Sequence, residues 1–159
     1  MEYKYPRNAL YIICPFCRLE YSLRAKFGAD IFFVTVSGGV INFHSDETLG
    51  LDEFLKREQI TDIYLVNDVS CNFIKEAINS EKGFGLHCEK HLRELSKKIS
   101  DDIDKLSVNE KKELLAKTNV LTQLNFLNSH NLIKDETSQI NIKVHGMIIN
   151  ENRGFEIIN

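Results

Sequence analysis

The chain has 159 residues, 43% of them hydrophobic and 27% charged, with a formal net charge of −3 and a pI of about 6.0. This length and composition predict one globular domain over residues 1–159. No basic surplus exists to neutralise phosphates, which argues against nucleic-acid binding. The apolar runs are too short to span a bilayer, and residues 1–6 lack an apolar signal segment, so we expect a soluble cytoplasmic protein with no membrane contact.

Short apolar runs recur along the chain and are typical of buried strands. They are Leu10–Ile13, Ile31–Val36, Ile63–Val66, Ile140–Val144 and Phe155–Ile158. Amphipathic patterns predict helices at Arg18–Phe27, at about Leu49–Glu58, after Cys71, along a stripe from Leu92 to Leu106, and from the capping box Ser107–Glu110 onward. This alternation predicts an α/β fold with a mostly parallel central sheet, flanking helices and a C-terminal antiparallel edge strand.

Metal-capable side chains follow two of the predicted strands. Cys14 comes directly after the first strand, and Asp68 and Cys71 come after the third. Active sites of such sheets lie at the carboxyl ends of the strands. Thiolates and a carboxylate are zinc ligands, and three of them leave one coordination position open, so Cys14, Asp68 and Cys71 form a candidate zinc site. The alternative is that both thiols are ordinary buried cysteines.

The pair Cys14 and Cys17 has a second interpretation. A Cys-x-x-Cys motif between a strand and a helix suits thiol–disulfide exchange and is similar to the active-site motif of glutaredoxins. That family also needs a cis-proline facing the thiols, and this chain has no proline after Pro15. The spacing also suits a fourth metal ligand, so we expect Cys17 to be either a ligand or a reversible thiol.

The remaining candidate ligands are weaker. His87, Cys88 and His91 lie near one another, and the two histidines share a helix face, but a solvated helix start explains them better. We expect Cys88 to be neither a ligand nor a reactive thiol. The other histidines have no partner set in the sequence and are interpreted as structural: His44, His130 and His145.

The order of these segments resembles that of the β-class carbonic anhydrases, from about Pro6 to the end of the chain. That family has a Cys-x-Asp-x-Arg motif after its first strand, where this chain has Cys14 to Arg18. Its Gly-Asp pair, strand and glycine turn correspond to Gly28–Asp30, the strand from Ile31, and Ser37–Gly39. Its His-x-x-Cys-Gly motif corresponds to residues 68–72, and its later helix and glycines correspond to Asn119, Gly146 and Gly154.

The resemblance implies a zinc ion held by Cys14, Asp68 and Cys71, with Cys17 as a possible further ligand. It also implies that Arg18 is a catalytic residue, which would hold the anionic product. The sequence departs from the family pattern at several positions. Asp68 replaces a histidine ligand, Phe16 replaces the aspartate that pairs with the arginine, Thr35–Val36 replace Arg-Asn, and Lys4 stands near an active-site glutamine.

These departures determine the function that the resemblance implies. An anionic ligand in place of imidazole weakens the metal as a Lewis acid, so reversible hydration of carbon dioxide to bicarbonate, a zinc lyase activity, should be weak or absent. Two alternatives stay open: a thiol–disulfide redox protein that uses Cys14 and Cys17, and a non-catalytic binding or assembly module on the same fold. We also expect a homodimer, as family members commonly associate through helices and edge strands.

Overall fold

The computed structural model describes residues 8–42, 51–79, 82–99, 104–129 and 141–159. Five strands form one sheet in the order β2-β1-β3-β4-β5. The strands are β1 (Ala9–Ile13), β2 (Ile31–Thr35), β3 (Asp62–Asp68), β4 (Lys143–Ile149) and β5 (Phe155–Ile158). The first four run parallel and β5 pairs antiparallel with β4, which confirms the predicted sheet.

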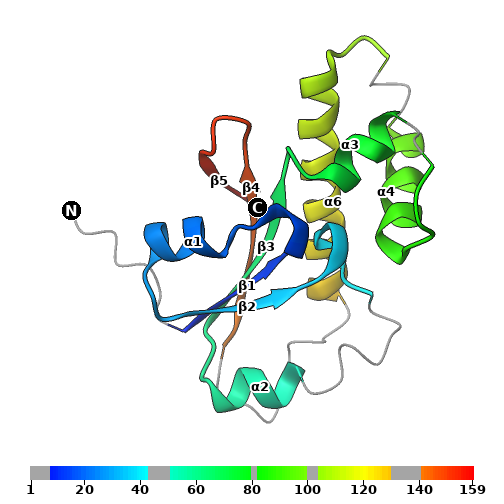
Figure 1. Ribbon diagram of the computed structural model, residues 1–159. Helices are drawn as coiled ribbons and strands as arrows, with labels where there is room; N and C mark the ends of the chain where they lie inside the picture. The colour runs from blue at the N-terminus through cyan, green and yellow to red at the C-terminus, as the bar shows by residue number, and fades with distance from the viewer. Residues whose placement is uncertain (1–7, 43–50, 80–81, 100–103, 130–140) are drawn as a thin grey trace.

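Helices cover both faces of this sheet (Figure 1). One face carries α1 (Glu20–Phe27), and the other carries α3 (Asn72–Asn79), α4 (His87–Lys98) and α6 (Val108–Ser129). A further helix, α2 (Leu51–Arg57), contacts the outer strand β2 through an edge-on pair of rings, Phe54 on Phe32, 5.5 Å apart. Two 3-10 turns, Pro15–Cys17 and Ser37–Gly39, follow β1 and β2.

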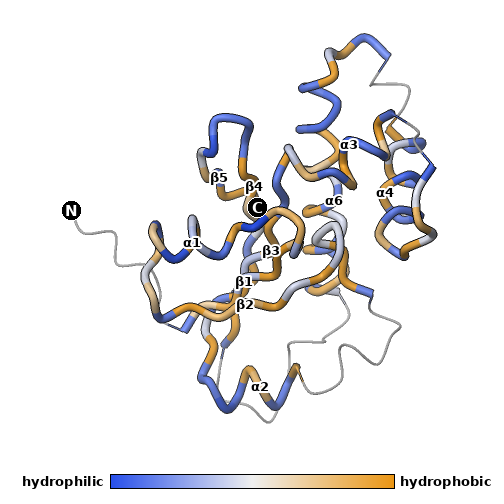
Figure 2. The backbone as a smooth tube through the Cα atoms, viewed as in Figure 1, coloured by the Kyte–Doolittle hydropathy of each residue, from blue (hydrophilic) through white to orange (hydrophobic). Residues whose placement is uncertain are grey.

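Side-chain alternation divides the core into two layers. Leu10, Ile12 and Leu65 join the large core beneath α3, α4 and α6, whereas Tyr11 and Val66 join the smaller core beneath α1. All five residues of β1 are buried, because a central parallel strand is covered on both faces. Figure 2 shows hydrophobic residues concentrated along these inner strands. No helix of the described part is long and apolar enough to cross a membrane.

Two element boundaries differ from those the sequence predicts. The fourth strand was expected at Ile140–Val144, but β4 spans Lys143–Ile149 and pairs along the whole of β3. The last four residues of β4 are all buried, so they show no alternation of polar and apolar residues. The predicted alternating segment overlaps β4 only at Lys143 and Val144. In the stripe predicted from Leu92 to Leu106, α4 ends at Lys98, and residues 100–103 lie outside the described part of the chain.

Gly146 on β4 lets Val120 of α6 and Ile158 of β5 lie close to the β4 backbone. A Cβ at this position would lie 2.6 Å from Val120 Cγ1 and 2.9 Å from Ile158 O. We predict that Gly146→Ala lowers the free energy of unfolding by about 1–3 kcal/mol, the usual cost of overpacking. Urea denaturation measures it, with Lys143→Ala at the exposed start of the same strand as a control expected to change it by less than about 0.5 kcal/mol. Equal stability of Gly146→Ala and wild type would contradict the close packing.

Candidate metal centre

Three thiols meet at the carboxyl ends of the central strands. Cys14 follows β1, Cys17 ends the first 3-10 turn, and Cys71 lies between β3 and α3. The sulfur atoms of all three lie within 4.8 Å of one another, and the Cys71 and Cys14 Sγ atoms are 3.9 Å apart. Among the residues that the structure describes, this is the one group of three or more potential ligand atoms gathered so closely. The structure therefore brings together two of the predicted ligands, with Cys17 as the third.

The local chain path explains how the thiols converge. Cys14 continues the alternation of Leu10 and Ile12, so its side chain enters the large core. Pro15 then opens a 3-10 turn in which the Cys17 N–H donates to the Cys14 carbonyl over 3.2 Å, folding the second thiol back over the first. Cys71 is positioned by a turn closed by its N–H on the Asp68 carbonyl, 3.0 Å away.

Hydrogen bonds concentrate negative charge on one sulfur of the cluster. The Cys17 and Cys71 thiols and backbone donors, among them the Gly38 N–H 3.2 Å from the sulfur, lower the pKa of Cys14 to about 3 although burial opposes this. The same contact with Cys14 raises the pKa of Cys71 to about 12 and raises that of Cys17 far above its ordinary value. Without metal, the cluster thus holds one thiolate and two thiol donors.

The geometry of the cluster fits a tetrahedral thiolate-bound metal. Zinc–sulfur bonds of 2.3 Å at tetrahedral angles place two sulfurs about 3.8 Å apart. The Cys14 and Cys71 sulfurs are already at 3.9 Å. The cluster is shielded from water, since Cys14 and Cys71 are buried and Cys17 is partly buried. Three sulfur donors would leave one coordination position open.

The structure does not bring Asp68 into this group. Asp68 is the last residue of β3, and its carboxylate is not among the ligand atoms that gather within 4.8 Å of one another. Its Oδ2 accepts a hydrogen bond from Arg153 Nη1 over 2.6 Å, and its Oδ1 accepts one from the Ser70 N–H over 2.8 Å. Chain order predicts Asp68 beside the cysteines, whereas in this structure its carboxylate is bound to Arg153 and Ser70.

In the segment that resembles the Cys-x-Asp-x-Arg motif, the residues at the aspartate and arginine positions lie at the surface. Arg18 is exposed, with a left-handed backbone (φ 52°) that turns the chain toward α1. Phe16 is 64% exposed and packs edge-on against Phe73 at 5.6 Å. No ion pair to Arg18 is found among the described residues. The arginine is thus next to the thiols in the chain but lacks the carboxylate that the family motif supplies.

The histidines take other roles. His87 and His91 stack 6.4 Å apart on α4, and His91 Nε2 bonds to Asn119 Oδ1 over 3.0 Å, while burial lowers the pKa of His91. Cys88 is buried, and burial raises the pKa of its thiol to about 11. His145 bonds to Asp62 over 2.7 Å. His44, His130 and Lys4 lie outside the described residues.

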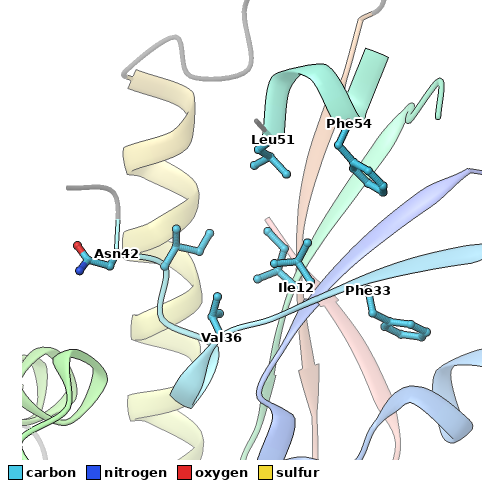
Figure 3. A pocket seen from close by; sticks show the side chains of 8 residues that line it. Ile12, Phe33, Val36, Asn42, Leu51 and Phe54 are labelled. Atoms are coloured by element: carbon cyan, nitrogen blue, oxygen red, sulfur yellow. The ribbon is translucent and has the colours of Figure 1, made fainter. Parts of the chain in front are cut away.

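Two hollows lie beside the sheet ends. One, of about 220 Å³, is almost wholly apolar and lies between β1, β2 and α2; Figure 3 shows Ile12, Phe33, Val36, Asn42, Leu51 and Phe54 around it. The other, of about 430 Å³, is more polar and is lined by residues of the Ser37 turn and the start of α4, among them Thr35, Ser37, Asn42, His87 and Cys88. Because Ser37 adjoins Gly38, this second hollow borders the turn that contacts Cys14.

Sequence reasoning missed the part played by the backbone and by buried amides. The Gly38 N–H on Cys14 and the amide side chains that hold its turn carry no short motif, since they come from three separate elements. The one available signal was the pair of glycines after β2, which indicated a turn but not its target.

The comparisons with known proteins agree on one family. The sequence matches the family model described as carbonic anhydrase over residues 9–155. No curated protein matches it significantly.

Several solved structures share the fold. The β-carbonic anhydrase CafA of Aspergillus fumigatus superposes with a TM-score of 0.80 at 20% identity, covering 98% of this chain and 76% of that one. A tetrameric β-carbonic anhydrase of Sordaria macrospora gives 0.80 at 15% identity, covering 98% and 82%. A Coccomyxa β-carbonic anhydrase in complex with acetazolamide gives 0.74 at 17%, covering 98% and 72%. At such identities these structures establish the fold alone.

The shared charge of the thiol cluster predicts a specific pH dependence. Because the Cys14 pKa is lowered from 9.0 to about 3, the folded, metal-free protein should show one thiolate at neutral pH. The stabilisation from this thiolate is fully present above the unfolded pKa of 9.0 and is lost as the pH falls through the folded value of about 3. Thiolate ultraviolet absorbance against pH measures the charge. Cys71→Ala, which removes the donor to Cys14, should move the transition toward higher pH, whereas Cys88→Ala should not; absence of a thiolate at neutral pH would contradict the arrangement.

Proposed function

Because this chain belongs to the β-class carbonic anhydrase family, we propose that it binds zinc through Cys14, Cys17 and Cys71 and hydrates carbon dioxide weakly or not at all. The observation that carries the proposal is the convergence of three sulfur atoms within 4.8 Å, with one pair already at the separation of two thiolates on a single metal. The expected ligand set changes accordingly, with Cys17 in place of Asp68.

The proposed donor set is the reason to expect weak hydration of carbon dioxide. Zinc supplies a Lewis acid that activates water for attack on carbon dioxide. The resemblance implies two thiolates and an imidazole in the family, whereas three thiolates carry one more negative charge. Greater electron donation weakens the Lewis acid and so opposes activation of water at neutral pH. Asp68, at the position of the family's histidine, is instead paired with Arg153.

Phe16 and Arg18, at the surface next to the thiols, also lead us to expect weak hydration of carbon dioxide. A carboxylate at position 16 would pair with Arg18 and accept a hydrogen bond from the reacting water, and Phe16 can do neither. Arg18 keeps the charge needed to hold bicarbonate, so we assign it that role in any residual hydration. The ring of Phe16 is mostly exposed, so its presence reflects contact with Phe73 rather than core packing.

A thiol–disulfide redox protein is the alternative from another class. The lowered pKa of Cys14 and the nearness of Cys17 suit an attacking thiolate with a resolving thiol. Against it, no cis peptide bond occurs among the described residues, so the cis-proline of the glutaredoxin arrangement has no counterpart in this part of the chain. Metal content and disulfide formation separate the two proposals. If the protein binds zinc but does not hydrate carbon dioxide, the result would support the other alternative, a non-catalytic binding or assembly module.

The ligand set predicts how single variants respond. Purified wild type should hold one zinc per chain, measured by metal analysis and by competition with a chromophoric chelator. Cys17→Ser should lower zinc affinity by more than about tenfold, because changes outside the ligand set already cost 10–100-fold. Asp68→Asn and the control Cys88→Ser should keep the affinity of wild type.

The opposite results would identify the other hypotheses. Loss of zinc in Asp68→Asn with retention in Cys17→Ser would return the ligand set to Cys14, Asp68 and Cys71. A metal-free wild type that rapidly forms a Cys14–Cys17 disulfide in air would support the redox protein. A parallel carbon dioxide hydration assay of the zinc-loaded wild type should show activity far below that of a typical family member.

We further expect this chain to form a homodimer. The edge strands β2 and β5 each have one side unpaired within the described residues, and Ile157 on β5 is 48% exposed. Such edges are templates for pairing with another chain. Light scattering at micromolar concentration should give about twice the 18.3 kDa of one chain. A mass of one chain would refute the dimer, and a larger multiple would indicate higher assembly.

A further inference from the structure

Three amide side chains are buried in the large core on the side of the thiols. Asn67 comes from β3, and Asn119 and Gln123 come from consecutive turns of α6. They are 3%, 0% and 2% exposed. A buried amide costs free energy unless its donors and acceptors are satisfied, so three together in an apolar layer require a specific arrangement.

The hydrogen bonds of these amides run in one consistent direction. Gln123 Nε2 donates to Asn119 Oδ1 over 3.2 Å, and Asn119 Nδ2 donates to Asn67 Oδ1 over 2.7 Å. Asn67 Nδ2 donates to the Val66 carbonyl over 3.0 Å. Since Asn119 Oδ1 is an acceptor, the His91 nitrogen 3.0 Å from it must carry the hydrogen. The network links α4, α6 and β3 with every amide oriented.

Gln123 extends this network to the glycine turn. Its Nε2 donates to the Gly39 carbonyl over 2.9 Å, and its Oε1 accepts from the Ile41 N–H over 2.9 Å. One side chain thus holds the turn by both a donor and an acceptor. Gly38 and Gly39 both have φ of 65°, and a Cβ on Gly39 would lie 2.5 Å from Asn67 Nδ2. The turn therefore packs against the amides with no room for a side chain at Gly39.

The fixed turn presents a backbone donor to the thiol cluster. The Gly38 N–H lies 3.2 Å from Cys14 Sγ, next in the chain to the carbonyl that Gln123 holds. A donor to an ionised sulfur stabilises the charge and gives a stronger hydrogen bond than a neutral pair. We propose that Gln123, oriented by Asn119, is a positioning residue that keeps the Gly38 N–H on the Cys14 sulfur and thereby strengthens metal binding by the three thiols.

The effect on metal rests on the proposed function, whereas the effect on the Gly38 N–H does not. The competing explanation is that the amides merely attach α6 to the turn. Gln123→Glu tests this with little change of volume. It replaces the Nε2 donor by an oxygen that would face two acceptors, Gly39 O and Asn119 Oδ1. Gln123→Met removes the same bonds without adding charge and serves if the glutamate variant does not fold.

Two controls match this change. Gln59→Glu makes the same substitution at an exposed position and should behave as wild type. Leu127→Ala on the same helix removes a buried side chain outside the network and should lower the stability of the fold without touching the turn. Leu127→Ala therefore distinguishes a general loss of stability from a loss of the position of the Gly38 N–H.

The first readout is hydrogen exchange of the metal-free protein, followed residue by residue. In Gln123→Glu or Gln123→Met, the Gly38 amide should exchange more than tenfold faster relative to the Leu65 amide of the central strand. In Leu127→Ala the two amides should accelerate together. Equal acceleration of both amides in the Gln123 variants would overturn the proposal.

The second readout is Co²⁺ binding, followed by sulfur-to-cobalt charge-transfer absorption. The Gln123 variants should bind Co²⁺ about tenfold more weakly, equivalent to about 1.4 kcal/mol, with the absorption band shifted. Leu127→Ala should leave the band in place. If wild type shows no such band, the proposed zinc site fails, and hydrogen exchange alone decides the positioning role. If wild type binds Co²⁺ and the Gln123 variants match it in affinity and band position, the claimed effect on metal binding is wrong.

Discussion

The parallel pairing of β1 with β3 is the contact on which the thiol cluster depends. Its register sets Ile12 beside Leu65, so the two strands end at the same edge of the sheet with matching faces. Cys14 then emerges directly from β1, and the turn after β3 returns Cys71 to the same layer. A one-residue shift of either strand would send a thiol to the opposite face. Packing of hydrophobic residues on both faces fixes this register.

A charged sulfur inside the protein requires compensation, and the chain supplies it from neutral groups. Two thiols and the Gly38 N–H surround Cys14, and no cation is paired with its sulfur among the described residues. Such a site is well suited to a dication, because three ionised sulfurs would repel one another strongly without it. Metal binding and local order are therefore coupled, since ions that displace thiol protons also remove the thiol–thiol hydrogen bonds.

Much of the fold could be predicted from the sequence because the central strands have simple patterns. β1, β2 and β3 are apolar runs bounded by polar or turn residues, and the capping box at Ser107 located the start of α6 closely. The cluster of Cys14 with Cys71 followed from strand ends alone. Asp68 shows the limit, because its carboxylate is held by Arg153, which is 85 residues away in the chain. Gln123 shows another, since its partners in the glycine turn, Gly39 and Ile41, are more than eighty residues away in the chain.

The pair of Asp68 and Arg153 joins the end of β3 to the turn between β4 and β5, where Arg153 adopts a left-handed backbone. This contact ties the turn before Cys71 to the β4–β5 hairpin, because the Asp68 carboxylate accepts hydrogen bonds from both Arg153 and the Ser70 N–H. A change at position 68 would therefore alter the anchoring of the hairpin together with the turn beside the thiols.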